Sequence, residues 1–407
     1  MAADTALEAR ESSYAYIRLV TSLLLMTIGG AGMFTVVVAL KPLAAEFGAS
    51  RSAAAIAYAV TTVGFGVGGV LMGRWADRVG VMLPALFGSV CLALGFVLAG
   101  RAETMWQLYL AQGLLIGFFG NAAVFAPLVA DITHWFQRRR GIAVAIVISG
   151  NYLAGTVWPP ITQYCIDAWG WRASFTGIGL FCLVTMLPLA LLLHRRPPGL
   201  DGLAQAQDAA PARPLAMAPR TLQVLLCCAG VGCCVAMAMP QTHIVAHASD
   251  LGHAAQRGAE MLALMLGTGV VSRLVFGLVS DRVGGLRTLL AGSVLQCAAL
   301  ILFMPVDGLT ALYLISALFG LSQGGIVPAY TIVIRAFFPP RQAGWRIGTV
   351  MMFTLVGMGL GGWLAGLLYD LTGSYRVAFV NAIAFNLMHT AIAATLLSRA
   401  RRLGVRG

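Results

Sequence analysis

Long apolar stretches recur along the whole of this 407-residue chain, and they restrict its possible folds more than any other feature. Each is about 20 residues long, the length that an α-helix needs to cross a bilayer. Only 10% of the residues are charged, against about 25% in a typical soluble domain. The pattern predicts an all-α membrane protein; a β-barrel would show short alternating segments instead. Twelve transmembrane helices are expected, near residues 17–40, 53–73, 82–100, 105–131, 141–165, 172–193, 220–247, 257–279, 286–304, 308–337, 345–369 and 374–398.

The net charge of +12 is distributed as a membrane topology requires. If both termini are cytoplasmic, six of the 27 Lys and Arg residues fall outside, Arg273 falls within a span, and the other 20 fall inside. The six outer residues are Lys41, Arg51, Arg101, Arg172, Arg257 and Arg376. This asymmetry is the positive-inside rule, so the charge needs no nucleic-acid partner. The polar N-terminus does not resemble a cleavable signal, and we expect a multi-pass protein of a bacterial inner membrane.

Residues 194–219 form a long polar stretch that divides the chain. Their Pro, Ala and charged residues predict a cytoplasmic linker between two six-helix bundles, residues 1–193 and 220–407. The halves also match each other. GRWADRVG at 73–80 recurs as GLVSDRVG at 277–284, and WRASF at 171–175 recurs as YRVAF at 375–379, both 204 residues later. Two matches at one offset indicate an internal duplication, as in transporters that bind substrate between their repeats.

The repeated G-x-x-x-D-R-x-G loop resembles the signature loop of the major facilitator superfamily. The resemblance covers essentially the whole chain and implies two pseudo-symmetric six-helix bundles. Further motifs are similar to the bacterial monocarboxylate and oxalate/formate branch, which carries small organic anions such as lactate, pyruvate, formate or oxalate. These motifs are EFGASR after helix 1, WFQRRRG before helix 5, GWRASF at the start of helix 6, H-x6-D-L-G at 243–252, and an arginine followed by SDR on helix 8.

Arg273 lies within the apolar run LALMLGTGVVSRLVFGLVSD, where a charged side chain is costly unless it faces a partner, a cavity or a ligand. Arginine holds a carboxylate through two parallel hydrogen bonds and stays charged at any relevant pH. Its equivalent in the first half is Gly69, 204 residues earlier, so the duplicated scaffold does not need this charge. The resemblance implies a substrate arginine on helix 8. We predict that Arg273 binds a substrate carboxylate and takes part in coupling; the alternative is an arginine paired for packing.

His243 and Asp250 lie late in the expected helix 7 and just after it. The resemblance implies that this pair accompanies the arginine. We expect His243 to donate a hydrogen bond to substrate or to titrate near neutral pH. We expect Asp250 to accept the coupling proton, or to pair with Arg273 when the site is empty. The alternative for His243 is a histidine that is simply hydrogen-bonded in place.

Polar side chains on the expected helices 4, 5 and 10 are candidates to line the substrate cavity, since polar groups in lipid need partners. Some of them will instead form hydrogen bonds between helices. The candidates are Asn121, Asn151, Tyr152, Gln163, Gln323 and Tyr330. Phe125 is a further candidate. The branch often has a tyrosine at this position, and phenylalanine lacks its hydroxyl group. Its phenyl ring makes the expected cavity more apolar, so the substrate is expected to have a larger tail than formate.

A second cation is absent from the expected helix 11, which contains no Lys or Arg after Arg346. Oxalate-type members have a cation there. Since one buried cation balances one carboxylate, a monoanion is favoured over a dianion. The chain's only lysine, Lys41, lies at the external end of helix 1 and is predicted to be interfacial.

The repeated loops contain four expected gating residues, Asp77, Arg78, Asp281 and Arg282. An aspartate at a helix end can hold an arginine or the N-terminus of a neighbouring helix, and the glycines allow close packing. These contacts would close the cytoplasmic side in one state and release when the bundles rock.

The expected function is proton-coupled transport of a small monocarboxylate by a monomer in the lipid bilayer. No cofactor or metal is expected, because cysteines such as Cys233 and Cys234 suit helix contacts. An enzyme is not expected either, because no combination of nucleophile and base appears within the expected spans. The alternatives are an efflux antiporter for drugs or neutral metabolites, an oxalate/formate-type anion exchanger, and a membrane sensor. An efflux antiporter would have acidic residues in its cavity, for which Asp131 and Glu260 are the nearest candidates.

Overall fold

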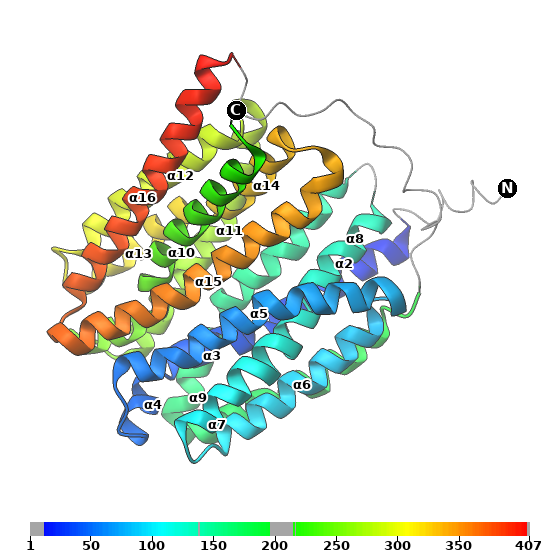
Figure 1. Cartoon of the computed structure of the whole chain (residues 1–407). Coiled ribbons are helices and arrows are strands. Elements are labelled where there is room, and N and C mark those ends of the chain that lie inside the picture. The colour runs from blue at the N-terminus through cyan, green and yellow to red at the C-terminus, as the bar shows by residue number, and fades with distance from the viewer. Residues whose placement is uncertain (1–11, 137–138, 196–214, 216, 405–407) are drawn as a thin grey trace. The chain divides into compact units, whose positions relative to one another are not determined.

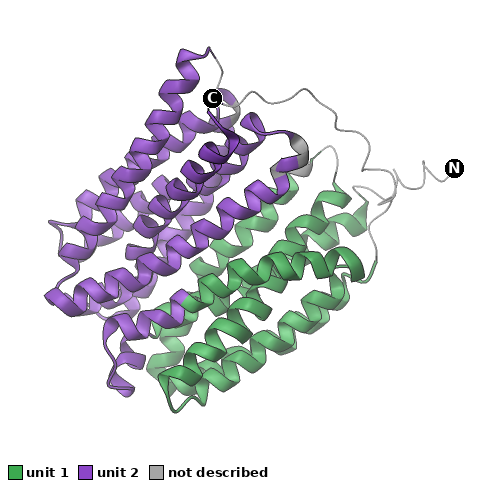
Figure 2. Ribbon diagram, in the orientation of Figure 1, with its two compact units in different colours: residues 1–39, 60–207 green, residues 40–59, 208–407 purple. Residues whose placement is uncertain are grey.

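The computed structural model describes residues 12–136, 139–195, 215 and 217–404, and the regular elements in that part of the chain are all helices (Figure 1). The chain forms two compact units, which Figure 2 distinguishes by colour. Unit 1 comprises Met1–Ala39 and Val60–Gln207, and unit 2 comprises Leu40–Ala59 and Asp208–Gly407. Most of the predicted linker, at 196–214 and 216, lies outside the described residues.

Each unit contains the helices of about half of the sequence. Those of unit 1 are α2 (Ser13–Gly29), α3 (Ala31–Val38), most of α5 (Arg51–Val79), α6 (Met82–Gly100), α7 (Met105–Leu110), the π-helix η1 (Ala111–Asn121), α8 (Ala126–Trp135) and α9 (Arg140–Leu191). Those of unit 2 are α4 (Leu40–Glu46), the start of α5, α10 (Pro219–Asp250), α11 (Ala255–Val283), α12 (Gly285–Phe303), α13 (Leu309–Gln323), α14 (Ile326–Phe337), α15 (Pro340–Thr372) and α16 (Tyr375–Arg402).

Among the described residues, 11 helical stretches are long and apolar enough to cross a membrane, and one of them contains two spans. This stretch, Ile142–Leu191, has 50 residues, more than twice the roughly 20 that one span needs. It breaks at Gly170, whose φ of 75° and ψ of 160° are not helical and favour glycine. The break lies between the spans predicted at 141–165 and 172–193, so the prediction of twelve transmembrane helices is confirmed.

Two of the predicted spans are interrupted. The first is divided into α2 and α3 at Gly30, where an added Cβ would lie only 2.3 Å from the Ala154 Cβ. The fourth consists of α7, η1 and α8 in succession. A π-helix is rare and often accompanies a functional site, and η1 ends at the candidate residue Asn121.

The internal repeat is visible in the packing of α5 on η1 and of α11 on α13. In unit 1, a Cβ on Gly64 would lie 2.3 Å from the Gly113 carbonyl oxygen. In unit 2, the Thr268 hydroxyl donates to the Ala317 carbonyl at 3.0 Å. Thr268 and Ala317 follow Gly64 and Gly113 by the same 204 positions. Both units therefore contain this helix pair in the same register.

A buried ion pair in unit 1 joins α2 to α8 and to the residues that follow α9. Arg18 donates from Nε and Nη2 to the Asp131 carboxylate, at 2.5 and 2.8 Å. Its Nη1 donates to the carbonyl groups of Leu193 and Arg195, at 3.2 and 2.9 Å. The side chains of the pair are only 1% and 6% exposed. Asp131 is therefore a structural partner of Arg18 in this state.

Candidate substrate-binding sites

Arg273 is half-buried on α11, beside the break between α13 and α14. Its Nε lies 3.5 Å from the Gly324 carbonyl oxygen, a long distance for a hydrogen bond. The two helices approach closely here, because a Cβ on Gly324 would lie 3.0 Å from the Arg273 backbone nitrogen. No other charged residue occurs in the sequence between Glu260 and Asp281. Unit 2 therefore contains a cation within an apolar helix, next to the end of another helix.

A pair of buried amides lies close to this break. Gln323, the last residue of α13, is fully buried and immediately precedes Gly324. Its Oε1 accepts a hydrogen bond from Gln241 Nε2 at 3.0 Å, while its own Nε2 has no hydrogen-bond partner in the part of the chain that is described. This Nε2 is a buried amide donor that could still form a hydrogen bond. Gln241 is not among the residues predicted from the sequence, where its one signal is an amide within the apolar helix α10.

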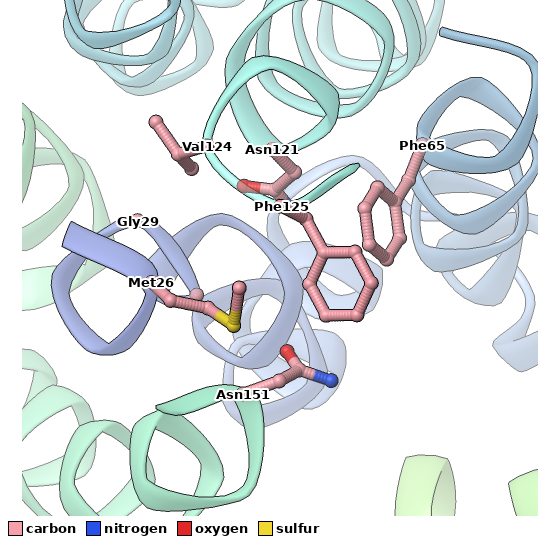
Figure 3. Close-up of a pocket in the computed structure, with 8 residues that line it drawn as sticks. Met26, Gly29, Phe65, Asn121, Val124, Phe125 and Asn151 are labelled. Atoms are coloured by element: carbon pink, nitrogen blue, oxygen red, sulfur yellow. The ribbon is translucent and has the colours of Figure 1, made fainter. Parts of the chain in front are cut away.

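A small pocket in unit 1 brings together three predicted substrate contacts (Figure 3). Asn121 of η1, Phe125 just before α8 and Asn151 of α9 line it. The other lining residues are Met26, Gly29, Gly30, Phe65 and Val124. Most of the wall is apolar, and the rings of Phe65 and Phe125 meet edge to face with centroids 5.2 Å apart.

Asn121 is the polar group of this pocket that most needs a partner. It is only 6% exposed, and its Oδ1 accepts no hydrogen bond from any described residue. A buried polar atom without a partner costs about 1–3 kcal/mol. Its Oδ1 therefore lacks a partner in this conformation, and a contact with a substrate donor stays a prediction.

Neither Tyr152 nor Tyr330 lines this pocket. Tyr330 is fully buried in the core of unit 2, and its hydroxyl lies 3.5 Å from Cys233 Sγ. Tyr152 is nearly buried on α9, next to Asn151. Both stay predicted substrate contacts, although the burial of Tyr330 favours a packing role.

His243 is fully buried on α10, and both of its ring nitrogens have partners. Nε2 lies 2.8 Å from the Gly362 carbonyl oxygen, and Nδ1 lies 3.0 Å from the Tyr375 hydroxyl. Since a carbonyl can only accept, the neutral ring carries its proton on Nε2 and accepts from the Tyr375 hydroxyl at Nδ1. This geometry favours the alternative of a histidine that is hydrogen-bonded in place, and it leaves no ring nitrogen for a substrate in this conformation.

Asp250, at the end of α10, is bound by two cations that the sequence analysis did not pair with it. Its Oδ1 lies 2.7 Å from Lys41 Nζ, and Arg51 Nη2 donates to its two carboxylate oxygens at 3.0 and 3.1 Å. Arg273, by contrast, lies 18 residues after Ala255, roughly 27 Å along the axis of α11. The expected pairing of Asp250 with Arg273 is therefore absent from this conformation. Lys41 is an ion-pair partner of Asp250, and its interfacial position stays a prediction.

The predicted gating residues lie at equivalent positions, in the last turns of α5 and α11. The side chains of Asp77, Arg78 and Arg282 are exposed. Gly80 and Gly284, which follow these helices, have φ values of 87° and 90°, a conformation that favours glycine. The sharp chain reversal explains the repeated glycine, whereas a gating role for the charged residues stays a prediction.

The sequence matches the model of the Major Facilitator Superfamily over residues 21–271 and again over residues 224–406. Monocarboxylate transporter 13 of Bos taurus is 30% identical over 353 residues, which cover 84% of this chain and 79% of that protein. Monocarboxylate transporter 11 of Homo sapiens is 30% identical over 338 residues, which cover 80% and 70%.

Solved structures with low sequence identity share the fold. The peptide transporter POT in complex with sulfate superposes with a TM-score of 0.76 at 12% identity, covering 100% of both chains. A bacterial homolog of the human lysosomal transporter Spinster, in an inward-facing and occupied conformation, gives a TM-score of 0.71 at 16% identity, covering 96% of this chain and 98% of that chain. The family match, the curated relatives and the fold together show that this chain belongs to the major facilitator superfamily.

Proposed function

We propose that this transporter carries a small monocarboxylate by proton-coupled alternating access, with Arg273 binding the carboxylate group. The position of Arg273 carries the proposal: it is a cation within an apolar helix, next to the break between α13 and α14. A guanidinium can donate two parallel hydrogen bonds to one carboxylate. A single cation suits a monoanion better than a dianion.

Two further observations support this substrate class. Monocarboxylate transporters 13 and 11 match most of the chain. The unit 1 pocket has an apolar wall beside Asn121 and Asn151. Its free space in this conformation is about that of one water, so we propose that it widens in another state to take a short hydrocarbon tail.

We also propose the topology and the coupling ion. The positive-inside rule favours cytoplasmic termini. We propose that the membrane is a bacterial inner membrane and that the protein acts as a monomer. Protons are the proposed coupling ion, with Asp250 and Arg273 as the coupling residues. Uptake that does not respond to an imposed proton gradient would exclude symport while leaving carboxylate binding intact.

Purified protein is expected to melt at a higher temperature in the presence of lactate or pyruvate, and to respond less to oxalate or succinate. A ligand that binds only the native state stabilises it by about 2.7 kcal/mol at 100 times its Kd. Differential scanning fluorimetry with this panel measures the shift. The shift is expected to vanish in Arg273→Ala.

Arg257→Ala is the matched control, since Arg257 lies on the same helix but is 54% exposed. It should keep the full monocarboxylate shift. Equal shifts in Arg273→Ala and the native protein would place the carboxylate elsewhere and favour the efflux alternative.

Phe125→Tyr is expected to move selectivity toward shorter, more polar acids. The added hydroxyl would lie in the apolar part of the pocket and make it a poorer site for a hydrocarbon tail. A methylene-sized difference in a pocket changes selectivity by roughly 10–200-fold, and we expect the lower end of that range. Competition between lactate and a longer 2-hydroxy acid measures it. Phe87→Tyr on α6 is the control, because Phe87 is 39% exposed and outside the pocket; an equal effect there would remove Phe125 from the site.

A further inference from the structure

His389 is a buried histidine at the middle of α16, one of the membrane-spanning helices of unit 2. It lies 14 residues after Tyr375, where the helix begins, and 13 residues before Arg402, where it ends. The residue is 0% exposed, and neither Nδ1 nor Nε2 has a hydrogen-bond partner among the described residues. An ionisable side chain within a span is costly and is by default a candidate for function.

Two other helices enclose the His389 side chain. On α10, a Cβ at Gly232 would lie 3.4 Å from the His389 Cβ and 2.9 Å from the Phe385 carbonyl oxygen, so α10 and α16 are in close contact here. On α14, the Tyr330 ring lies with its centroid 6.2 Å from that of the imidazole. A buried polar atom without a partner is destabilising. The two ring nitrogens are therefore satisfied only by a ligand or by a different packing of these helices.

Polar side chains in the neighbouring turns of α16 bind partners on α12 instead of His389. Asn386, one turn earlier, donates from Nδ2 to Gln296 Oε1 at 3.0 Å. The hydroxyl groups of Ser293 and Thr390 are 2.6 Å apart. The contact between α12 and α16 is thus satisfied without the imidazole, which rules out His389 as the residue that holds these two helices together.

The charges on the four helices around His389 lie far from the middle of α16. Each charged residue of α10, α12, α14 and α15 is within two turns of a helix end. These are Arg220, Asp250, Arg287, Arg335, Arg341, Arg346 and Asp370. The other titratable residues on these helices are Cys227, Cys228, Cys233, Cys234, His243, His247, Cys297, Tyr330 and Tyr369. The imidazole therefore faces neutral groups, and a charge on it would have no counter-charge at the same depth.

Other groups of unit 2 that could take a proton are already engaged or lie near a helix end. Both ring nitrogens of His243 have partners, and Asp250 is bound by two cations. His247 has an unpaired Nε2 but lies within one turn of the end of α10. A neutral imidazole has one nitrogen whose lone pair accepts a proton. At mid-span, His389 retains this lone pair.

We propose that His389 is a proton-binding site, neutral in this conformation and protonated in one where α16 packs differently against α10 and α14. An imidazolium has two N–H donors and a full charge, which the present packing does not satisfy. Proton binding therefore favours the other packing. The inference rests on the proposed proton coupling, to which it adds a second proton-binding group besides Asp250.

The short helix α14 connects this site to the proposed carboxylate site. Tyr330, which packs against His389, is the fifth residue of α14. The helix begins two residues after Gly324, whose carbonyl oxygen lies 3.5 Å from Arg273 Nε. A shift of α14 on protonation would therefore reach the surroundings of Arg273. Because coupling between two binding sites is reciprocal, an anion at Arg273 would also change the proton affinity of His389.

The test measures proton-driven accumulation and exchange separately, in proteoliposomes that contain the full-length protein. With the outside one pH unit more acidic, one proton per monoanion supports about tenfold accumulation of labelled lactate or pyruvate. Protein-free liposomes give the passive background. His389→Gln keeps a hydrogen-bonding side chain that does not titrate. We expect it to lose the accumulation, while exchange of labelled for unlabelled acid at equal pH stays within twofold of the native rate.

His389→Phe is the second variant, since its ring fills the space and needs no hydrogen bond. We expect it to melt no lower than the native protein and to lose accumulation in the same way. The matched control is His253→Gln, because His253 is a partly exposed histidine of unit 2 whose Nε2 lies 3.1 Å from the Asp307 carbonyl oxygen. It should retain both accumulation and exchange.

Accumulation within twofold of the native value in both His389 variants would overturn the assignment. A parallel loss of exchange and accumulation in folded protein would also overturn it, since that result indicates a packing role. Both outcomes leave the proposed symport intact. A native protein that accumulates nothing above the background would instead contradict the symport, and the assignment with it.

Discussion

Replacing Arg273 by alanine is expected to reduce monocarboxylate uptake about 100-fold or more. The substrate would lose two charge-assisted hydrogen bonds, each worth about 1.5–3 kcal/mol. Arg273→Lys keeps the charge but loses the planar fork, so we expect a smaller loss of about tenfold. Initial uptake rates of a labelled monocarboxylate into proteoliposomes measure both effects, normalised to the amount of folded protein.

The matched control for this experiment is Arg257→Ala on the same helix. Arg257 is exposed and pairs with Glu260 at 3.1 Å, so its loss should leave uptake near the native rate. Folded Arg273→Ala protein with uptake within a factor of three of the native rate for every accepted acid would contradict the assignment.

The transmembrane helices could be predicted from sequence because few structures satisfy the backbone in lipid. An apolar run of spanning length has little alternative to a helix, and the chain reversal at Gly170 falls in the expected gap. The interruptions at Gly30 and in η1 could not be predicted in this way. Residues on both sides of those breaks are equally apolar, so hydropathy does not distinguish a broken helix from a straight one.

Site residues could be predicted from the sequence with a physical reason only where the side chain is energetically unfavourable in its local sequence. Arg273 is such a residue, because a cation in an apolar helix is unusual whatever its neighbours. Asn121, Phe125 and Asn151 were predicted as individual candidates, and their position around one pocket depends on the packing of η1, α8 and α9.

Charge pairing was the least predictable feature. Lys41, Arg51 and Asp250 were all assigned to the external side of the membrane, which is compatible with their contact. The choice of partner depends on how the chain between α3 and α5 folds, and no sequence spacing encodes it. The pairing of Arg18 with Asp131, 113 residues away, escaped the sequence analysis for the same reason.

Asp131→Asn is expected to destabilise the protein by about 3–5 kcal/mol, because it leaves the buried guanidinium of Arg18 without a counter-charge. If each kcal/mol lowers Tm by about 2–4 °C, the fall should be roughly 6–20 °C. The carbonyl groups of Leu193 and Arg195 would still accept hydrogen bonds from Arg18, but they carry no full negative charge. Thermal unfolding of the purified variant measures the loss.

The double variant Arg18→Met with Asp131→Leu separates the cost of a broken pair from the value of an intact one. Removing both charges removes both desolvation costs, so this variant is expected to be much more stable than Asp131→Asn, and replacement of buried pairs by apolar residues can even be stabilising. Glu103→Gln, at an exposed acid, is the control and should change Tm little. If Asp131→Asn were as mild as Glu103→Gln, the Arg18 charge would have to be hydrated, which its 1% exposure argues against. The double variant could instead be less stable than Asp131→Asn. The ion pair would then stabilise the protein by orienting α2, α8 and the end of α9, because an apolar pair fills the space but forms no directed hydrogen bonds.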